Sequence, residues 1–383
     1  MTNAVLVCPT TKLSLAYVPL AAARAAIGVE TLASRPPQEG FNATPFGETS
    51  TVLLRSDNKA AYPVLNDCIP VLFAPEVLGR SDSLPSFDLR DVRYAEAYEE
   101  MDHYNAIGQK LARLVADGQM AALESQDGFG LKQLGRIPDR MAGIAKGQKF
   151  PRPFNTWVAS RADVASEIDC YEHLAPVEGK RILQIGGAAD TILRLLLAGA
   201  RDGVLLTPMV GEALVSMELA KIFGLSDRLQ CVIGVGEELP FADEALDSAI
   251  SAACVHHMDT RLAFPEINRV LRRGGKFAAF DPWLAPLHNI GTAILGKREH
   301  GVHCRPMDRK RVAPLYTAFG YGKAVLHGAF VRYAMIVWND KLGLPLSLDW
   351  AVRLSKFDDA VSSFVPGMRK LGSGVAMIAT KSS

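Results

Sequence analysis

Short apolar runs alternate with amphipathic stretches along the chain from about Arg161 to Ser383. The runs predict buried strands, and the stretches between them carry apolar residues at helical spacing. Such alternation is typical of an α/β protein in which crossover helices connect the strands of a mostly parallel sheet. The predicted strands are Arg181–Ile185, Val204–Thr207, Leu229–Val232, Ser248–Ala252, Phe277–Phe280, Val325–Phe330 and Val375–Thr380. The predicted helices are Asp163–Leu174, Thr191–Leu197, Glu212–Phe223, Arg261–Leu271 and Lys310–Ala318, and residues 341–368 are predicted to be inserted before the last strand.

The first segment, residues 1–84, is predicted to form a small α+β domain. Strand-like runs occur at residues 4–8 and 62–73. Between them, Pro, Gly, Ser and Thr are frequent at residues 34–56, which predicts loop and turn.

The second segment, residues 85–160, is predicted to be a helical cap followed by a linker. Residues 94–114 carry apolar positions at helical spacing, and a weaker helix is predicted at 120–123. The sequence Lys-Phe-Pro-Arg-Pro-Phe at residues 149–154 breaks the pattern and predicts the linker to the third segment, residues 161–383.

Composition narrows the class of protein. A chain of 383 residues is long enough for two or three units, and the formal net charge of +1 argues against broad nucleic-acid binding. No apolar run approaches the roughly 18 residues of a membrane span, and no secretory signal is evident at the N-terminus. The six cysteines are scattered, which is typical of a reduced protein. We therefore expect a soluble cytoplasmic protein without a nucleic-acid or membrane partner; a homodimer is left open.

Two consecutive glycines follow the first strand of the third segment. Gly186 and Gly187 lie between that strand and a predicted helix, where small residues let a ligand approach the backbone and the helix offers unpaired N–H groups. Taken alone, the pair is as consistent with a tight structural turn as with a cofactor site.

Motifs downstream of the turn occur in a recognisable order. Residues 237–247 read Glu-Glu-Leu-Pro-Phe-Ala-Asp-Glu-Ala-Leu-Asp, the fourth strand is followed by His256-His257, and residues 269–275 read Arg-Val-Leu-Arg-Arg-Gly-Gly. From about Gly179 to Asp281, this series resembles the class I S-adenosylmethionine-dependent methyltransferases. The resemblance implies a Rossmann-like sheet of seven strands with helices on both faces, and S-adenosylmethionine as cofactor.

The resemblance also implies where the cofactor binds, at the carboxyl ends of the strands. It implies contacts from the glycine turn, from the ends of the second, third and fourth strands, and from the cap helix; these residues are Gly186, Gly187, Ala188, Thr207, Pro208, Met209, Gly236, Glu237, Glu238, Ala253, Cys254, Tyr98 and Tyr104. The chain departs from the family pattern at four positions, which are Gln184, Asp190, Thr207 and Val235. Thr207 replaces the usual ribose-binding acid, for which Glu212 is an alternative.

The first segment resembles the small zinc-ribbon-like domains that accompany some methyltransferases, through Cys8-Pro9-Thr10-Thr11 and residues 62–72. The second cysteine of the usual pair is Thr11 here. Tetrahedral zinc requires four nitrogen or sulfur ligands, and two cysteines cannot supply them. We therefore predict no metal, and a docking or lid-supporting role for this segment.

Methyl transfer requires a nucleophile held in line with the methyl group and, for many acceptors, a base. His256 and His257 are candidates for that base because histidine titrates near neutral pH; alternatively, one of them packs structurally. Asp281 is a candidate to orient a histidine or to accept a proton; alternatively it caps a turn. The substrate candidates follow the fifth strand and alternatively form a charged surface loop; they are Trp283, Arg298, His300, His303 and Arg305.

These observations favour a methyltransferase that acts on a small molecule, with an anionic acceptor as one alternative for Arg298 or Arg305 to bind. The four departures from the family pattern leave a second hypothesis, a protein of this fold that does not transfer methyl groups. Methylation of RNA or protein is a third.

Overall fold

The computed structural model describes residues 6–27, 50–72, 108–110, 112–113, 116–118, 164–187, 190–286, 298–299, 302–303, 305–338, 342, 344 and 348–382. Most of the predicted cap and linker lies outside these residues. The sequence predictions for Tyr98, Tyr104, Ala188 and His300 also lie outside them. The described residues 108–110, 112–113 and 116 of the cap are helical.

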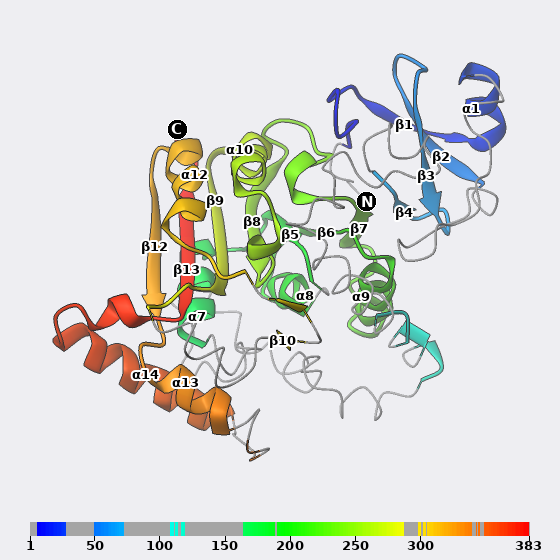
Figure 1. Ribbon diagram of the computed structural model, residues 1–383. Coiled ribbons are helices and arrows are strands. Elements are labelled where there is room, and N and C mark those ends of the chain that lie inside the picture. Colours follow the sequence, from blue (N-terminus) through cyan, green and yellow to red (C-terminus); the bar gives the residue numbers. More distant parts are fainter. Residues whose placement is uncertain are drawn as a thin grey trace.

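A seven-stranded sheet forms the centre of the molecule, in the order β12-β13-β9-β8-β5-β6-β7 (Figure 1). Strands β5, β6, β7, β8 and β9 run parallel, and β13 runs antiparallel between β9 and β12. The strands are β5 Arg181–Ile185, β6 Asp202–Thr207, β7 Leu229–Ile233, β8 Leu246–Ala252, β9 Leu271–Pro282, β12 Gly322–His327 and β13 Gly374–Thr380. The predicted Rossmann-like class is confirmed.

Helices cover both faces of this sheet because alternate side chains of each strand point to opposite faces. On β5, Ile182 packs in one core and Leu183 in the other. The first core contains α7 Val164–Leu174, α8 Asp190–Leu197 and α9 Val210–Ile222; the second contains α10 Thr260–Val270 and α12 Arg309–Phe319. Each predicted helix therefore lies where the sequence places it.

The chain leaves the sheet in opposite directions after β5 and β8. Strand β6 lies on one side of β5, and β8 lies on the other. In open sheets of this kind, ligands bind outside the carboxyl ends of the strands at such a switch point. A ligand site is therefore expected at the turns that follow β5, β6, β7, β8 and β9.

The N-terminal lobe, residues 6–27 and 50–72, forms a second sheet in the order β1-β2-β3-β4 (Figure 1). Its elements are β1 Leu15–Pro19, α1 Leu20–Ile27, β2 Thr51–Arg55, β3 Ala61–Leu65 and β4 Ile69–Pro70. Strand β2 is a correction, because its residues lie in the stretch predicted as loop and turn. Its residues pair with both β1 and β3, so tertiary pairing overrides the local composition.

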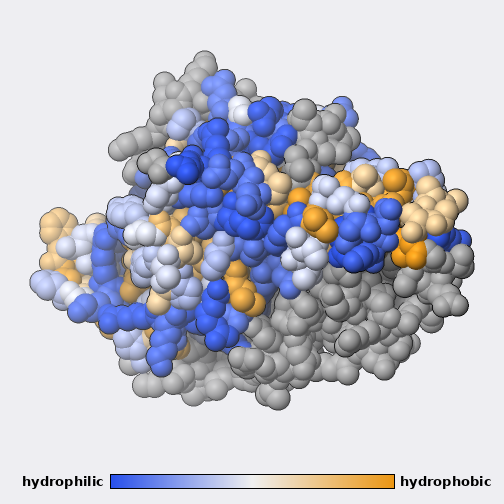
Figure 2. Space-filling view, turned by 90° about the horizontal axis from the view of Figure 1, so that it is seen from above, coloured by the Kyte–Doolittle hydropathy of each residue, from blue (hydrophilic) through white to orange (hydrophobic). Residues whose placement is uncertain are grey.

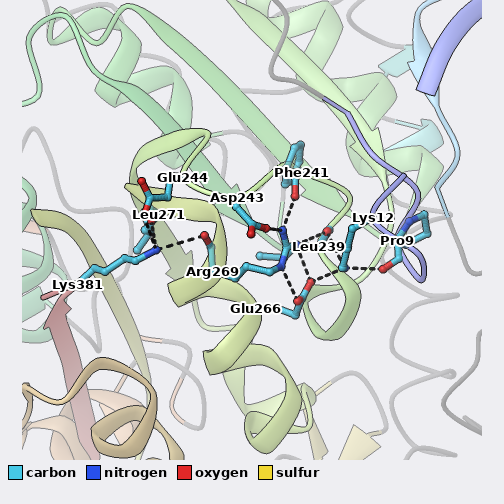
Figure 3. A network of polar contacts seen from close by, with 10 residues as sticks. All are labelled: Pro9, Lys12, Leu239, Phe241, Asp243, Glu244, Glu266, Arg269, Leu271 and Lys381. Atoms are coloured by element: carbon cyan, nitrogen blue, oxygen red, sulfur yellow. Dashed lines mark hydrogen bonds and ion pairs between the residues drawn. The ribbon is translucent and has the colours of Figure 1, made fainter. Parts of the chain in front are cut away.

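Polar contacts attach the lobe to the central domain. Lys12 Nζ lies 2.7 Å from Glu266 Oε2 on α10 and donates to the carbonyl of Leu239 at 3.3 Å. Arg269 binds the other carboxylate oxygen of Glu266 at 2.8 Å, so one acid joins both cations (Figure 3). Leu72 N–H also donates to the carbonyl of Ile233 at 2.7 Å, beside β7. The lobe is therefore packed on the outer edge of the sheet.

Cys8 begins the turn that resembles a zinc ribbon. Its sulfur lies 3.0 Å from Tyr62 Oη, accepts from Thr11 N–H at 3.3 Å and lies 3.7 Å from the Arg55 guanidinium. Burial alone would raise the pKa of this thiol, but these hydrogen bonds outweigh burial and lower it. Within the described residues, no cluster of three or more His, Cys, Asp or Glu side chains is arranged to hold a metal.

Two helices and a short hairpin complete the described fold. Helix α13 Val331–Ile336 and helix α14 Leu348–Phe364 follow β12, and the 3-10 helix η7 Met368–Leu371 leads into β13. Helix α14 is the predicted insertion. The hairpin joins β10 Arg298–Glu299 and β11 Val302–His303. No helix among the described residues is long and apolar enough to cross a membrane.

His327, the last residue of β12, joins α14 to α7. Its Nδ1 lies 2.8 Å from Asp359 on α14, and its Nε2 lies 2.9 Å from Asp169 on α7. Burial by itself would lower the pKa of His327, but hydrogen bonds with the two carboxylates outweigh burial and raise the pKa to about 9.

This pair of contacts predicts a pH-dependent stability. Because the folded pKa lies above the ordinary value of 6.5, the stabilisation is fully present below about pH 6.5 and is lost as the pH rises through about 9. We expect the free energy of unfolding to fall by about 3 kcal/mol over that window. Urea unfolding of the wild type and His327→Gln at several pH values measures it. If the free energy of unfolding of His327→Gln fell with pH as steeply as that of the wild type, the assignment would be wrong.

Candidate functional site

The glycine turn after β5 has a backbone that only glycine adopts easily. Gly186 and Gly187 have φ angles of +77° and +73°. Gly186 N–H donates to the carbonyl of Leu206 at 2.7 Å, which ties the turn to β6. A Cβ on Gly186 would lie 2.7 Å from both Cβ and Sγ of Cys254, so the turn after β5 is packed directly against the turn after β8.

Gln184 organises this turn from within β5. Its Nε2 donates to the carbonyl of Gly186 at 2.9 Å, and its Oε1 accepts from Ile192 N–H at the start of α8 at 2.8 Å. The side chain is fully buried. An acid at this position, usual in the family that the sequence resembles, accepts hydrogen bonds but cannot donate when ionised. Gln184 therefore joins the turn to the helix by donating one hydrogen bond and accepting another, which an ionised acid could not do.

A buried carboxylate lies at the end of β6. Thr207 Oγ1 donates to Glu212 Oε2 at 2.5 Å and accepts from Met209 N–H at 3.1 Å. Both side chains are buried, and α9 begins at Val210. The carboxylate of Glu212 thus lies beside Thr207, the strand position at which the resemblance leads us to expect an acid.

The described part of the cap approaches the same place. Gly108 packs against the first turn of α9, since a Cβ on Gly108 would lie 2.4 Å from the carbonyl carbon of Gly211 and 2.8 Å from the backbone nitrogen of Glu212. A helix of the cap therefore crosses the start of α9 beside the buried acid.

The end of β7 leads into the 3-10 helix η4 Gly236–Glu238. Glu237 points toward the next loop, where its Oε1 accepts from Asp259 N–H at 2.8 Å. Burial raises the pKa of Glu237 to about 7. A Cβ on Gly236 would lie 2.8 Å from Met258 Sδ. The two loops are consequently held against each other at this end of the sheet.

The end of β8 is conformationally strained. Ala253 has a φ of +53°, and its N–H donates to the carbonyl of Phe280 at 2.8 Å. A non-glycine residue in this region costs of order 1–3 kcal/mol and commonly occurs at functional sites. The strained turn presents Cys254 to the glycine turn and starts the 3-10 helix η5 Val255–His257.

His256 and Asp281 form a buried pair between η5 and β9. Asp281 Oδ1 accepts from the backbone N–H of His256 at 3.0 Å and lies 2.8 Å from His256 Nδ1. The two contacts fix both the main chain and the ring of His256. With a proton on Nδ1 donated to the carboxylate, the basic lone pair of the imidazole is on Nε2.

His257 lies beside this pair, with its ring centroid 3.8 Å from that of His256. Burial lowers the pKa of His257 well below 6.5, and His256, Arg311 and Arg305 act in the same direction. His257 is therefore neutral at physiological pH.

Arg311 holds the main chain around these histidines. From α12 it donates to the carbonyl of His256 at 2.8 Å and to that of Met258 at 3.2 Å, and it also donates to the carbonyl of Arg305 at 2.7 Å. Arg311 is not predicted as a site residue from the sequence. Its only sequence signal is a cation two residues after the start of a helix, and it becomes visible only when the chain folds.

The predicted substrate residues are less closely grouped. Arg305 is exposed near His257. Trp283 is buried and packs in the core with α10 and α12, and its contact with substrate stays a prediction. Arg298 and His303 pair in the β10–β11 hairpin through their main chains, and their side chains are not described.

Comparison with known proteins gives a partial match. A protein family described as a methyltransferase domain matches residues 210–279. An uncharacterized methyltransferase of Mycobacterium tuberculosis is 28% identical over 108 residues, which are 28% of this chain and 42% of the relative. An uncharacterized Escherichia coli protein is 41% identical over 58 residues, which are 15% of this chain and 28% of that protein. The chain thus spans less than half the length of these curated relatives.

Solved structures give more distant likenesses. A geranyl diphosphate C-methyltransferase from Streptomyces coelicolor has 16% sequence identity and a TM-score of 0.38, with 56% of this chain and 77% of that chain covered. A phosphoethanolamine N-methyltransferase of Haemonchus contortus has 16% identity and a TM-score of 0.39, with 54% of this chain and 50% of that chain covered.

Proposed function

We propose that this chain, which contains a class I S-adenosylmethionine-dependent methyltransferase domain, transfers a methyl group to a small-molecule acceptor. The observation that carries the proposal is the His256–Asp281 pair. It lies one turn beyond Cys254, and Cys254 packs against Gly186. A base is thereby within the same group of strand ends as the turn that the family uses for its cofactor.

The residues present suit the cofactor. Gly186 and Gly187, with positive φ angles, leave the main chain open to a ligand, and the buried carboxylate of Glu212 with Thr207 supplies acceptors for ribose hydroxyls. When bound, S-adenosylmethionine would supply a methyl group activated by its sulfonium, with S-adenosylhomocysteine as the leaving group. The departures at Gln184 and Thr207 thus have local compensations, which support methyl transfer over a fold without it.

His256 would act as the base that removes the acceptor's proton. Asp281 accepts a hydrogen bond from Nδ1–H, which keeps that proton on the ring and leaves Nε2 to take the proton from the acceptor. The buried carboxylate then lies opposite the imidazolium that forms, which lowers the energy of that charge. His257, neutral and packed beside the pair, would position the acceptor without adding a competing charge.

The acceptor is proposed to be small and to carry an anionic or polar group. Arg305 is an exposed cation whose charge reaches His257, so it lies on the approach to the histidines. The formal net charge of +1 gives no broad basic face for RNA.

Isothermal titration with S-adenosylmethionine and S-adenosylhomocysteine tests the proposal first. A screen of small acceptors, read out as S-adenosylhomocysteine release, tests the reaction. No binding of either compound at millimolar concentration would refute methyl transfer. Binding with no turnover on any small acceptor but turnover on RNA or protein would refute the acceptor class alone.

Glu212→Gln is expected to weaken S-adenosylhomocysteine binding by about 10- to 100-fold. The variant loses a charge-assisted hydrogen bond, which contributes roughly 1.5–3 kcal/mol. Titration calorimetry measures the change. Glu218→Gln is the matched control, because Glu218 lies on the same helix but pairs with the exposed Lys221. Equal affinities for the two variants would exclude Glu212 from the ribose site.

A further inference from the structure

Helix α14 exposes a row of aromatic side chains. Trp350, Phe357 and Phe364 are 57%, 58% and 85% exposed. They are seven residues apart, so they lie on one face of the helix. Val365 and Leu371 extend the apolar surface beyond the helix, at 46% and 41% exposed. Exposed aromatics gathered in this way on one element mark an interaction surface.

The helix that carries them is firmly held from its other face. Ala351 and Val352 are buried in the first core. Asp358 is almost fully buried and accepts hydrogen bonds from the N–H groups of Ala329, Phe330 and Val331 at 2.7–3.1 Å. Asp359 adds the contact to His327 described above. The exposed row therefore belongs to an ordered helix whose inner face is already satisfied.

The exposed charged side chains that the structure describes around the aromatic row are basic. Arg353 and Lys356 are exposed on α14, and Arg369 and Lys370 are exposed on η7. The Arg353 guanidinium lies 5.6 Å from the centre of the Trp350 ring. The described carboxylates of this region, Asp358 and Asp359, are turned to the inner partners named above. The outer face is thus aromatic and basic.

The structure assigns this face to the surface of an anionic phospholipid bilayer. A helix with exposed Trp and Phe and flanking Lys and Arg lies in the interface of such a membrane, with the rings among the acyl chains and the cations at the headgroups. In a two-fold dimer through this face, the four cations of one copy would lie against the four cations of the other, and their charges would repel. The row lies on a protruding helix and not in a groove, which suits a flat surface better than a partner's helix.

The position of α14 agrees with this assignment. Figure 1 shows α14 at the periphery, beyond β12 and away from the N-terminal lobe. His327 pairs with Gly374, and Gly374 pairs with Pro282, so α14 follows the strand ends on the side of the candidate site. The opposite side of the sheet, seen in Figure 2, is predominantly hydrophilic over its middle. The molecule would therefore contact the membrane with the side that carries the carboxyl ends of the parallel strands. Membrane binding by this face does not depend on methyl transfer.

Cosedimentation with large unilamellar vesicles tests the assignment on the full chain. We expect binding to vesicles of phosphatidylcholine with about one third phosphatidylserine, and at least tenfold weaker binding to pure phosphatidylcholine. Phe357→Gln/Phe364→Gln should weaken binding to anionic vesicles about tenfold or more. Arg353→Gln/Lys356→Gln should weaken it about thirtyfold, and added salt should reduce wild-type binding.

Tyr321→Gln is the matched control, since Tyr321 is 72% exposed and lies immediately before β12. It should bind vesicles as the wild type does, and circular dichroism checks the fold of each variant. Absence of wild-type binding, or unchanged binding by both double variants, would overturn the assignment. A dimer in sedimentation analysis that Phe357→Gln/Phe364→Gln dissociates, without vesicle binding, would assign the face to a second copy instead.

Discussion

Gly186→Ala is expected to lower the free energy of unfolding by about 2–5 kcal/mol and to abolish detectable S-adenosylhomocysteine binding. A left-handed backbone costs an alanine about 1–2 kcal/mol. The added Cβ would also lie 2.7 Å from Cβ and Sγ of Cys254, and overpacking of this kind typically costs about 1–3 kcal/mol. Either the glycine turn or the turn after β8 must then move. Urea unfolding and titration calorimetry measure the two effects.

Two variants separate strain from clash. Gly179 has a φ of +71°, but a Cβ there would meet nothing within 4 Å, so Gly179→Ala carries the strain alone. Adding Cys254→Gly to Gly186→Ala removes the atoms that clash and should recover part of the lost stability. Equal losses for Gly186→Ala and Gly179→Ala would mean that the packing of the two turns does not matter.

The sequence predicts the central sheet well, and the reason is physical. Strands buried on both faces need continuous apolar runs, so β5 and β13 stand out in the sequence and begin and end close to their predicted residues. Helix α14 is likewise found inside the predicted insertion. The order of the strands is not readable from such runs and becomes known only from the fold.

The sequence does not reveal contacts between residues that are distant in the chain. Arg194 on α8 and Glu167 on α7 form a fully buried ion pair at 3.1 Å, yet each looks like an ordinary surface charge in a helical pattern. Strand β2 is missed for a similar reason, because its partners β1 and β3 stabilise it. The local pattern of apolar residues indicates which positions are buried, but it does not indicate which distant residue each of them contacts.

The candidate site divides along the same line. Gly186 is predictable because a turn into a helix near a ligand favours glycine. The alternative that Asp281 orients a histidine is available from the sequence, but the choice of His256 over His257 requires the fold, which places Nδ1 of His256 2.8 Å from the carboxylate. Glu212 is suggested from the sequence as an alternative acid, and the fold places its Oε2 2.5 Å from Thr207 Oγ1; its role at the ribose stays a prediction.

Asp281→Asn is expected to lower kcat by about 10²–10⁴-fold while leaving S-adenosylhomocysteine affinity unchanged. The carboxylate accepts a hydrogen bond from Nδ1–H of His256. It also stabilises the positive charge that forms on the ring when Nε2 takes the acceptor's proton. An amide carries no charge, and its NH₂ group can donate to Nδ1 and move the ring proton to Nε2, where it blocks the base. General-base catalysis contributes a factor of this size.

Two measurements distinguish a positioning role for Asp281 from a merely structural one. The nitrogen chemical shifts of the His256 ring report which nitrogen carries the proton, and they should change in Asp281→Asn while urea unfolding changes little. Asp308→Asn is the matched control, because Asp308 caps α12 through Arg311 N–H at 2.8 Å and asparagine caps a helix equally well. The rate is measured with the acceptor found in the screen. If Asp281→Asn and Asp308→Asn turn over equally, the acceptor reaches the site already ionised and needs no base, and His256 would then serve to position it.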